Sequence, residues 1–402
     1  MREMFTARRR IAAAIAAAAA AAVIGCGTAL PAEATPATGR ILHEDSVNAI
    51  DNSYIVALKE SAGFNANSTK GDELAAKYGA TVERTYSAAL NGYAVRVSAS
   101  GARSFAADPA VAFVEQDQEV HVNGTQILPP WGLDRIDQAN RPLNLTYTYP
   151  DTAGGSATVY VIDTGVRITH SQIDGRARYG YDFVDRDPIA ADGNGHGTHV
   201  ATTAAGSTYG VAKLADIVAV RVLNNSGSGT ASGVIAGVDW VTSRSVGPSV
   251  ANMSLGAGAS TALDTAVRNS IASGITYAVA AGNSTRNAAN FSPARVGAAL
   301  TVGASTSSDY RSSFSNYGSV VDMFAPGSSI PAGWHTSDTA TRTLSGTSMA
   351  APHVAGAAAV YLTSHPTARP ATVHSALVSG ATTGVLSNIG SGSPNRLLRL
   401  VP

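Results

Sequence analysis

The chain has 402 residues, of which 45% are hydrophobic and only 14% are charged, and its formal net charge is +0. This length suits two or three domains, and the combination of low charge and high apolar content excludes a mostly disordered chain. With 28 basic and 28 acidic residues, nothing in the charge balance favours nucleic acid or an anionic membrane surface as a partner.

The first segment predicts a secretory signal peptide over residues 1–34. Three arginines precede the apolar run Ile11–Ile24, and Ala32-Glu33-Ala34 offers a cleavage site. The run is short for a membrane span, so we favour secretion, with no stable membrane association of the mature chain, over a membrane anchor. Cys26 is the only cysteine, and the residues before it resemble a bacterial lipobox, so lipidation of the precursor is a minority alternative.

A small domain is predicted after this segment. Residues 35–52 are polar without clear periodicity and are interpreted as a linker, and the domain itself covers 53–123. The hydrophobic pattern predicts strands over 54–58, 92–97 and 111–114 and helices over 71–78 and 104–108. This alternation of strands and helices is typical of a small α+β domain of the split βαβ, ferredoxin-like kind.

A second, larger domain is predicted over 124–402. Its first residues, 124–130, show no pattern of a helix or strand, but apolar strands alternate with Ala/Gly-rich helices beyond them. The expected strands are Thr158–Ile162, Asp216–Val222, Ser249–Ser254, Ile275–Ala280 and Ala299–Val302, and the expected helices are His196–Gly206, Ser232–Thr242, Thr261–Ser273, Ser348–Ser364 and Pro370–Ser379. The alternation predicts an α/β fold with a mostly parallel sheet and helices on both faces.

Polar residues gather where these strands end and these helices begin. Ligands of open α/β sheets bind beyond the carboxyl ends of the strands. Asp163 and Asn283 follow strands, while His196 and Ser348 open helices among glycines. Each residue alone could be an ordinary cap or turn residue. Together they predict nucleophilic catalysis, because a serine at a helix start lies beside the free N–H groups that an oxyanion needs.

Four sequence blocks carry a family resemblance. V-I-D-T-G, G-H-G-T-H, A-A-G-N and G-T-S-M-A-A-P-H resemble the signature motifs of subtilases, and the order Asp, His, Ser is that of subtilisin. Further runs, including P-W-G-L-D-R-I-D and Y-G-V-A-K, are similar to the proteinase K-like branch. The resemblance spans nearly all of 124–402, and residues 53–121 resemble the inhibitory propeptide of these enzymes.

The resemblance implies a secreted serine endopeptidase made as a zymogen. Ser348 would attack the peptide carbonyl, His196 would transfer protons, Asp163 would orient the imidazole, and Asn283 would help to bind the oxyanion. The small domain would serve as intramolecular chaperone and inhibitor until self-cleavage between Val122 and Gln126 releases it. The mature enzyme is expected to be a monomer that acts on polypeptides.

The resemblance also implies that the substrate pairs as a β-strand between two segments of the enzyme. The residues expected to bind it are Ser254, Leu255, Gly256, Gly227, Ser228, Gly229, Ala280, Ala281 and Gly282. Backbone pairing makes little demand on side chains, which favours broad specificity. Because small residues wall the primary pocket, we expect a large apolar or aromatic side chain before the cleaved bond.

Acidic clusters that match family sites predict structural Ca²⁺, a hard ion that takes oxygen ligands. The expected ligands are Asp134, Asp137 and Gln138 in a first site, Asp182 and Asp187 in a second, and Asp322 with the carbonyls of Gly297 and Ala299 in a third. Asn144 and Gly297 stand where the family has an acid and a proline, and Val385 argues against a fourth site. Each cluster could instead be an ordinary solvated loop.

Rival interpretations differ in chemistry. An aspartic peptidase also uses D-T-G, but a single chain would need two such motifs and one is found. A metallohydrolase could use His196, His199 and His353, although the Glu of H-E-x-x-H is missing. A catalytically inactive subtilase-like surface or binding protein would keep the fold without the activity.

Overall fold

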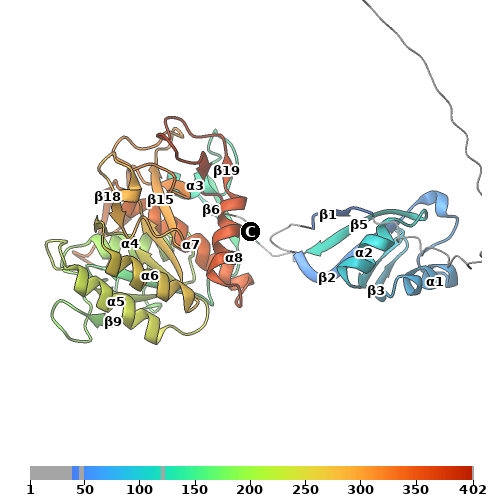
Figure 1. Cartoon of the computed structure of the whole chain (residues 1–402), viewed down its shortest axis with the longest axis horizontal. Helices are drawn as coiled ribbons and strands as arrows, with labels where there is room; N and C mark the ends of the chain where they lie inside the picture. The colour runs from blue at the N-terminus through green and yellow to red at the C-terminus, as the bar shows by residue number, and fades with distance from the viewer. Residues whose placement is uncertain (1–38, 45–48, 119–122, 401–402) are drawn as a thin grey trace, which may run out of the picture. The chain divides into compact units, whose positions relative to one another are not determined.

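The computed structural model describes residues 39–44, 49–118 and 123–400. These residues form two compact units, one of 39–44 and 49–117 and the other of 118 and 123–400 (Figure 1). The predicted signal peptide over 1–34, with Cys26, lies outside the described residues. Among the helices of the described ranges, none combines the length and apolarity that crossing a bilayer requires.

The first unit is a five-stranded sheet with helices packed against it (Figure 1). Its elements are β1 (Ile41–Leu42), β2 (Ala49–Leu58), η1 (Glu60–Ala62), α1 (Thr69–Lys77), β3 (Thr81–Tyr86), β4 (Gly92–Arg96), α2 (Ala99–Ala106) and β5 (Val111–Gln118). The strand order is β1-β5-β2-β4-β3, with β4 antiparallel to both of its neighbours. Ser68 and Ser98 cap the two α-helices by accepting backbone N–H groups. The unit is a small α+β domain, as predicted.

One strand of this unit was missed, and one expectation is wrong. Strand β3 was not predicted, because most of its side chains are exposed and show no alternation of apolar and polar residues. The expected linker over 35–52 contains structure, since β1 pairs in parallel with β5 and β2 begins at Ala49. The first four residues of β2 are exposed or half-buried, so their sequence carries no hydrophobic signal.

The second unit is built on a nine-stranded sheet in the order β19-β20-β16-β15-β13-β11-β8-β10-β9. Its strands are β8 (Thr158–Asp163), β9 (Ala177–Asp182), β10 (Asp216–Arg221), β11 (Ser249–Met253), β13 (Thr276–Ala280), β15 (Leu300–Ser305), β16 (Met323–Pro326), β19 (Thr382–Thr383) and β20 (Arg396–Leu397). All neighbouring strands are parallel except β19 and β20. The predicted, mostly parallel sheet is confirmed.

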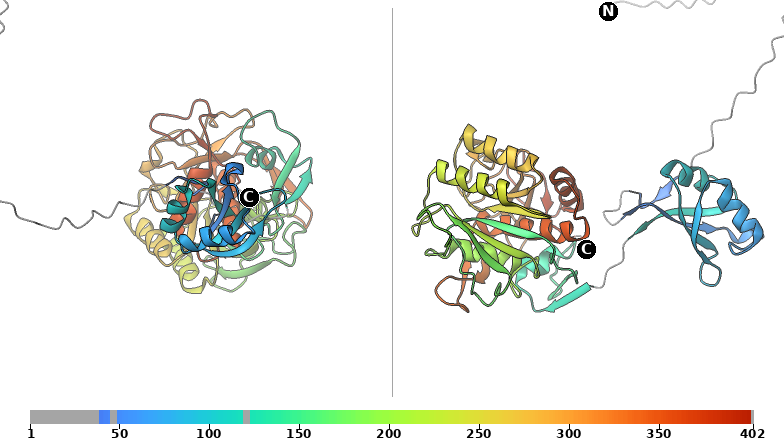
Figure 2. Two further views of the ribbon diagram at one scale, coloured as in Figure 1. Left: turned by 90° about the vertical axis from the view of Figure 1, so that its right-hand side faces the viewer. Right: turned by 90° about the horizontal axis from the view of Figure 1, so that it is seen from below.

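Helices cover both faces of this sheet. Along β8, Tyr160 and Ile162 belong to a core under α5 (Ala231–Arg244) and α6 (Thr261–Ala272). Val159 and Val161 belong to the opposite core, which packs against the helices α4 (His196–Ala205), α7 (Thr347–Ser364) and α8 (Pro370–Gly380). Figure 2 shows α5 and α6 on one side of the sheet and α7 on the other. Alternate residues of one strand therefore face different helices.

Shorter elements complete the second unit. They are β6 (Asn123–Ile127), α3 (Trp131–Ile136), β7 (Thr146–Pro150), β12 (Ala257–Gly258), η2 (Ala288–Asn290), β14 (Phe291–Ser292), β17 (Ile330–Gly333) and β18 (Thr341–Leu344). β6 pairs with β7, β12 with β14, and β17 with β18, each pair antiparallel. The expectation of no secondary structure over 124–130 is wrong for β6, because this strand pairs at the surface and leaves Ile127 largely exposed.

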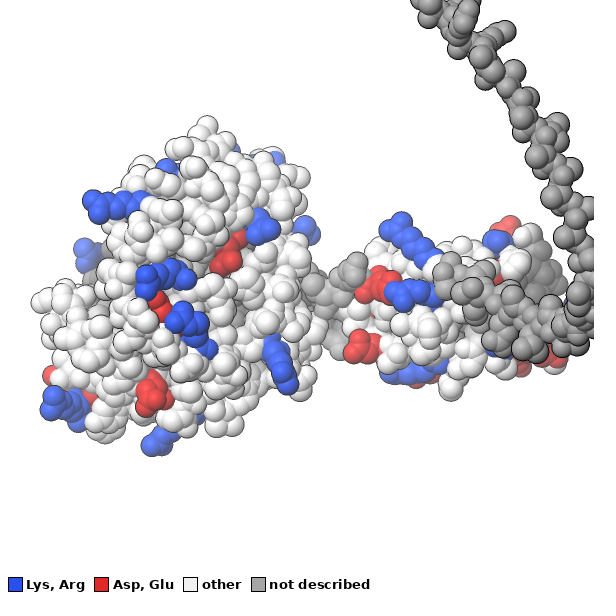
Figure 3. Space-filling model, viewed as in Figure 1, with Lys and Arg blue, Asp and Glu red and all other residues white. Residues whose placement is uncertain are grey.

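Charged side chains are sparse on the face of the second unit that Figure 3 shows. Lysine and arginine are interspersed there with aspartate and glutamate, and no large area of this face carries a single sign. Such a surface does not concentrate a field that would attract a polyanion or a polycation.

Candidate active site

Asp163 is the last residue of β8, and its side chain is fully buried. Its backbone carbonyl accepts the N–H groups of Val222 and Leu223, which fixes the end of the strand. The side-chain Oδ1 accepts the Thr164 N–H at 2.7 Å, whereas Oδ2 is buried without a hydrogen-bond partner among the described residues. A buried carboxylate with so few donors strongly favours a positive charge beside it.

His196 is the first residue of α4 and lies beside Asp163. Its Nδ1–H donates to Asp163 Oδ1 at 2.7 Å, which leaves Nε2 as the second ring nitrogen. Burial acts to lower the pKa of His196, but the carboxylates of Asp163 and Asp192 outweigh it and the pKa is raised. The preceding Gly195 has a φ of +108°, and a Cβ there would lie 2.4 Å from the Trp334 ring. Only glycine fits at this position.

Ser348 lies in the first turn of α7. Its Oγ–H donates to the Ser254 carbonyl at 3.1 Å, and no hydrogen bond joins it to His196 in the part of the chain that the structure describes. Ser254 Oγ–H donates in return to the Ser348 carbonyl at 2.7 Å. That carbonyl has no partner within the helix, because Pro352, four residues later, has no N–H to donate. It can therefore accept the hydroxyl of Ser254. The two serines thus hold β11 against the start of α7.

Asn283 follows β13 and is held by the same helix start. Its Oδ1 accepts both the N–H and the hydroxyl of Thr347, each at 2.8 Å. Because the carbonyl end of the amide is engaged, its NH₂ group is oriented and remains available as a donor. Gly282 has a φ of +102°, and a Cβ there would lie 2.4 Å from Asn316 Nδ2, so the turn before Asn283 requires glycine.

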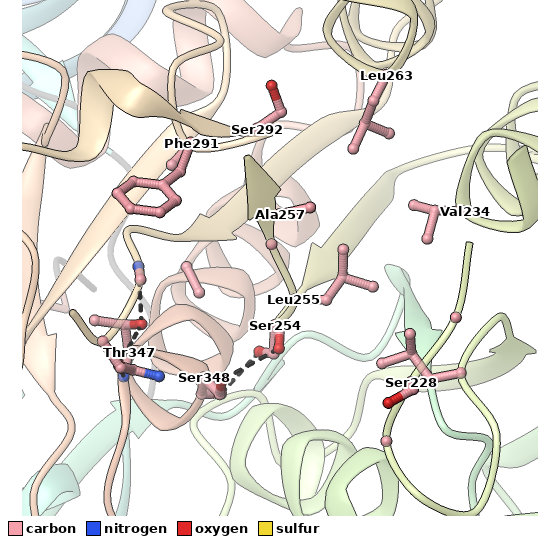
Figure 4. A pocket seen from close by; sticks show the side chains of 18 of the residues that line it. Ser228, Val234, Ser254, Leu255, Ala257, Leu263, Phe291, Ser292, Thr347 and Ser348 are labelled. Carbon is pink, nitrogen blue, oxygen red and sulfur yellow. Dashed lines mark hydrogen bonds between the residues drawn. The ribbon is translucent and has the colours of Figure 1, made fainter. Parts of the chain in front are cut away.

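A cavity of about 810 Å³ runs along this edge of the sheet. Its walls include His196, Ser348 and Asn283, together with every residue expected to bind substrate in 227–229, 254–256 and 280–282. Asp163 lies behind His196 and does not line the cavity. Figure 4 shows Ser348 and Ser254 joined by a hydrogen bond at one end of the segment 254–257.

The cavity also has apolar walls that the sequence analysis did not identify. Val234 from α5, Leu263 from α6 and Phe291 from β14 line it with the predicted Leu255. Figure 4 shows Leu255, Val234 and Leu263 gathered around one space. Helical periodicity predicts only that Val234 and Leu263 are buried. Thr347 was also missed, although it lies inside the G-T-S block beside Ser348.

The two other histidines of the metallohydrolase interpretation are buried and engaged. His199 Nε2–H donates to the carbonyls of Ile330 and Arg342, both at 3.1 Å, and His353 Nδ1–H donates to the Met349 carbonyl at 2.8 Å. Burial lowers the pKa of each to about 4. Within the described ranges, no group of three or more His, Cys, Asp or Glu is arranged to hold a metal ion. These histidines therefore serve as hydrogen-bond donors.

The structure brings the first predicted calcium loop together. Asp134 Oδ1 and Gln138 Oε1 both accept the Asn144 N–H, at 3.1 and 3.2 Å, and Asp134 Oδ2 accepts the Leu145 N–H at 3.0 Å. Asp137 Oδ2 accepts the Thr148 N–H at 2.6 Å, while its Oδ1 is buried without a partner among the described residues. Burial raises the pKa of Asp137 to about 6. An unpartnered carboxylate oxygen beside a second carboxylate and an amide oxygen fits a hard cation.

The second predicted calcium pair is not arranged for a cation. The N–H of Asp182 donates to the carbonyl of Asp187 at 2.8 Å, so the two residues do lie together. However, Asp182 Oδ2 pairs with Arg221 at 2.5 Å, and Oδ1 accepts two backbone N–H groups. The guanidinium already neutralises this buried carboxylate, and this arrangement does not support calcium there.

Asp322 of the third predicted site also has protein partners. Its Oδ2 accepts the Thr301 N–H at 2.7 Å, and its Oδ1 lies 3.2 Å from His374 Nε2. Ala299 is buried and Gly297 is exposed, so the two residues expected to offer carbonyls differ in their surroundings. Oδ2 is hydrogen-bonded, and Oδ1 faces the buried His374 Nε2, which has no hydrogen-bond partner among the described residues. This arrangement does not support a cation there.

Comparison with known proteins identifies both units. Residues 154–396 match the Subtilase family, and residues 43–123 match the family Peptidase inhibitor I9. The Extracellular serine proteinase of Thermus sp. (strain Rt41A) is 49% identical over 397 residues, which cover 94% of this chain and 96% of that protein. Alkaline serine exoprotease A of Vibrio alginolyticus is 46% identical over 380 residues, which cover 91% of this chain and 70% of that protein.

A solved structure agrees with these relatives. The crystal structure of a cold adapted subtilisin-like serine proteinase matches with a TM-score of 0.67 and 55% sequence identity, and the match covers 68% of this chain and 99% of that one. The resemblance read from the four sequence blocks is therefore confirmed, as are the protease activity and the propeptide that it implied. The chain belongs to the subtilase family of serine proteases and carries an N-terminal propeptide of the peptidase inhibitor I9 type.

Proposed function

We propose that Asp163, His196 and Ser348 form the catalytic triad of a secreted endopeptidase of broad specificity. The observation that carries this proposal is the 2.7 Å hydrogen bond from His196 Nδ1 to Asp163 Oδ1, beside a cavity that Ser348 and Asn283 also line. An imidazole fixed in this way presents Nε2 as a base, which is what an adjacent hydroxyl needs to become a nucleophile.

In the first step, Ser348 Oγ attacks the carbonyl carbon of the peptide bond while His196 Nε2 takes the hydroxyl proton. The Oγ must turn from the Ser254 carbonyl toward the imidazole, and such hydrogen bonds often tighten only when substrate binds. Asp163 keeps the proton on Nδ1 and stabilises the imidazolium, in line with the raised pKa of His196. His196 then protonates the leaving amine, and water hydrolyses the acyl-enzyme by the reverse transfers.

The oxyanion that forms during attack needs donors that are already in place. We assign this role to the NH₂ group of Asn283 and the backbone N–H of Ser348. The amide is fixed through its Oδ1 by Thr347, so its NH₂ group requires no reorganisation during the reaction. The Ser348 N–H belongs to the first turn of α7, where N–H groups lack partners inside the helix.

Substrate would bind as an extended strand between 254–256 and 227–229, because both segments line the same cavity. The small walls at 280–282 leave room for a large apolar or aromatic side chain before the cleaved bond. Leu255, Val234 and Leu263 would receive a second apolar side chain of the substrate. Cleavage-site profiling on a peptide library tests this assignment, and a dominant preference for basic residues would contradict it.

The I9-type unit would act as intramolecular chaperone and inhibitor of the enzyme. Self-cleavage between Val122 and Gln126 would then release a monomeric protease, after export directed by the segment 1–34. Val122, at the start of this junction, lies outside the described residues. Mass analysis of the secreted form would locate the mature N-terminus, and a lipid on Cys26 of the precursor would reveal the minority alternative.

Ca²⁺ would be held by Asp134, Asp137 and Gln138, and it would supply the positive charge that two neighbouring carboxylates lack. The buried, unpartnered Oδ1 of Asp137 supports this site. The test is the thermal midpoint of the Ser348→Ala precursor, with calcium and with a chelator. We expect calcium to raise the midpoint, and Asp137→Asn in the same background to abolish the rise. Equal midpoints with and without calcium would remove the proposal.

Casein hydrolysis by the wild type and by Ser348→Ala tests the triad. Loss of the nucleophile should lower kcat by about 10⁶-fold, as known for this enzyme family. Ser345→Ala removes a nearby exposed hydroxyl, which accepts the Ser329 N–H at 2.8 Å, and should keep full activity. A serine-directed phosphonylating reagent should label the wild type at Ser348. A catalytically inactive surface protein would show neither hydrolysis nor labelling.

A further inference from the structure

Asp192, in the loop before α4, is the centre of a dense hydrogen-bond cluster. Its Oδ1 accepts the Thr164 hydroxyl at 2.9 Å and the N–H groups of Asn194 and Gly195 at 2.9 and 2.8 Å. Its Oδ2 accepts the N–H and the hydroxyl of Thr198 at 2.9 and 2.6 Å. The carboxylate is half-buried and does not line the cavity. Its contacts are therefore with protein groups and not with substrate.

The partners of Asp192 adjoin two members of the proposed triad. Thr164 follows Asp163 at the end of β8, and its hydroxyl also accepts the Gly197 N–H at 2.9 Å. Gly195 immediately precedes His196, and Thr198 lies in the first turn of α4. One carboxylate thus ties the end of β8 to the start of α4. The separation of these two elements sets the hydrogen bond between His196 and Asp163.

A second contact runs through Asn194. Its backbone N–H is held by Asp192, while its Oδ1 accepts the His196 N–H at 3.1 Å and its Nδ2 donates to the Asn225 carbonyl at 2.9 Å. The first N–H groups of α4 have no partner inside the helix. Asn194 accepts the N–H of His196, and Asp192 accepts that of Thr198. A negative charge at this position is also favoured by the helix dipole.

Few charged or titratable groups face His196. Asp163 approaches from β8 and Asp192 from the loop, while His199 on the same helix stays neutral because burial lowers its pKa to about 4. From the β17–β18 hairpin, His335 reaches Gly195, where a Cβ would lie 2.5 Å from its Nδ1. In the described ranges no basic side chain pairs with Asp192, so its negative charge acts on His196 without a local counter-ion. Its effect on the pKa of His196 is upward, against burial.

We propose that Asp192 is a positioning residue for catalysis, which holds His196 against Asp163 and favours the imidazolium that forms during the reaction. The inference rests on the proposed triad. It extends the triad by a second carboxylate that acts through hydrogen bonds and charge, without touching the substrate.

The decisive variant is Asp192→Asn, which removes the charge and turns one acceptor oxygen into an NH₂ group that faces other donors. We expect kcat/KM to fall about 10- to 100-fold, mostly through kcat, with KM little changed. The acidic limb of the pH profile of kcat/KM should move to lower pH by about half a unit, because His196 loses one of two charges that raise its pKa. A role in packing alone would not move this limb.

Two further variants separate geometry from charge. Thr198→Val removes a hydroxyl that donates to Asp192 and accepts the Arg167 N–H, and it keeps the Asp192 charge. It should lower kcat by about 2- to 5-fold and leave the acidic limb in place. Asp174→Asn removes an exposed carboxylate for which the described part of the chain shows no hydrogen bond, and both kcat and the limb should stay unchanged. All rates are divided by the concentration of active sites, counted with a phosphonylating reagent.

The failure of this inference can be distinguished from failure of the triad. An active Ser348→Ala would overturn the triad itself. If Ser348→Ala is inactive while Asp192→Asn keeps the wild-type kcat, or loses kcat without any shift of the limb, the role of Asp192 is refuted. If Asp192→Asn does not yield folded protein by circular dichroism, the pair Thr164→Val and Thr198→Val removes both hydroxyl donors and keeps the charge. An unchanged kcat in that double variant would also refute the positioning role.

Discussion

The pKa of histidine is shifted in opposite directions at the edge of the large sheet and in the core beneath it. At the edge, two carboxylates raise the pKa of His196 although burial acts to lower it. In the core, His199 on the same helix and His353 on α7 have no carboxylate beside them among the described residues, and burial lowers the pKa of each to about 4. All three imidazoles are hydrogen-bonded, so hydrogen bonding alone does not explain the difference.

The difference lies in where the negative charges fall. A buried imidazole beside a carboxylate can accept a proton near neutral pH, which a general base requires. An imidazole whose partners are only backbone carbonyls remains neutral and acts as a donor. His196 is therefore suited to proton transfer, while His199 joins α4 to β17 and β18.

Asp163→Asn should have the largest effect, because it removes a charge that distinguishes His196 from the core histidines. The change removes the charge of the carboxylate that is hydrogen-bonded to His196. The pKa of His196 should therefore fall toward those of the core histidines, and its tautomer should no longer be fixed. We expect kcat to fall by about 10⁴-fold, as in related triads. Steady-state kinetics with active-site titration measure the loss. Activity within tenfold of the wild type would show that the carboxylate does not control His196.

Asn283→Leu sharpens the comparison at the same edge, because it removes a neutral donor and no charge. We expect kcat to fall by about 10²- to 10³-fold, a magnitude already established for this enzyme family. The acidic limb of the pH profile should stay where it is, since the two carboxylates beside His196 are untouched. A shifted limb would mean that Asn283 acts on the base and not on the oxyanion.

His199→Gln tests the core side of the comparison through stability. The unfolded chain protonates His199 near pH 6.5 and the folded chain only near pH 4, so stability falls as the pH drops through this window. Glutamine can donate similar hydrogen bonds without titrating. As the pH falls from 6.5 to 4, the free energy of unfolding should decrease by about 3 kcal/mol less in the variant than in its parent. Urea unfolding in the Ser348→Ala background measures this without self-digestion, and parallel pH curves would contradict it.

Lys213→Met extends the same reasoning to a buried ammonium. Lys213 donates to Gln126 Oε1 at 2.6 Å and to the carbonyls of Ser207 and Gly210, with no carboxylate partner in the described ranges. Burial lowers its pKa to about 7 from 10.5, so the unfolded chain binds more protons between these values and stability should rise with pH there.

Methionine keeps most of the volume of Lys213 and does not titrate. The variant should therefore lose about 3 kcal/mol of this rise, as judged by urea unfolding at pH 7 and pH 10 in the Ser348→Ala background. A rise of the same size in parent and variant would assign it to other groups.

Five buried strands of the large sheet could be predicted from the sequence, whereas the surface strands could not. The buried strand β16 was also missed, because its four residues, Met323–Pro326, are too short a run to stand out. Strand β8 was expected over Thr158–Ile162 and is found over Thr158–Asp163, because continuous apolar runs mark buried parallel strands. Strands β3 and β6 pair at the surface, and their sequences carry no periodic signal. Their formation depends on partner strands that the local sequence does not identify.

The sequence by itself identified the four residues of the proposed site. Asp163, His196, Asn283 and Ser348 each lie in a glycine-containing block at the end of a strand or the start of a helix, which local patterns reveal. The apolar wall of Val234, Leu263 and Phe291 was not predictable, because side chains from three elements meet there only after folding.

Only the tertiary structure decided the electrostatics of these groups. A pKa depends on burial and on charges that distant segments bring close, and neither quantity is contained in a local motif. Thus H-G-T-H places two histidines three residues apart, yet one lies beside the carboxylates of Asp163 and Asp192 and the other beneath a hairpin from residues 330–344.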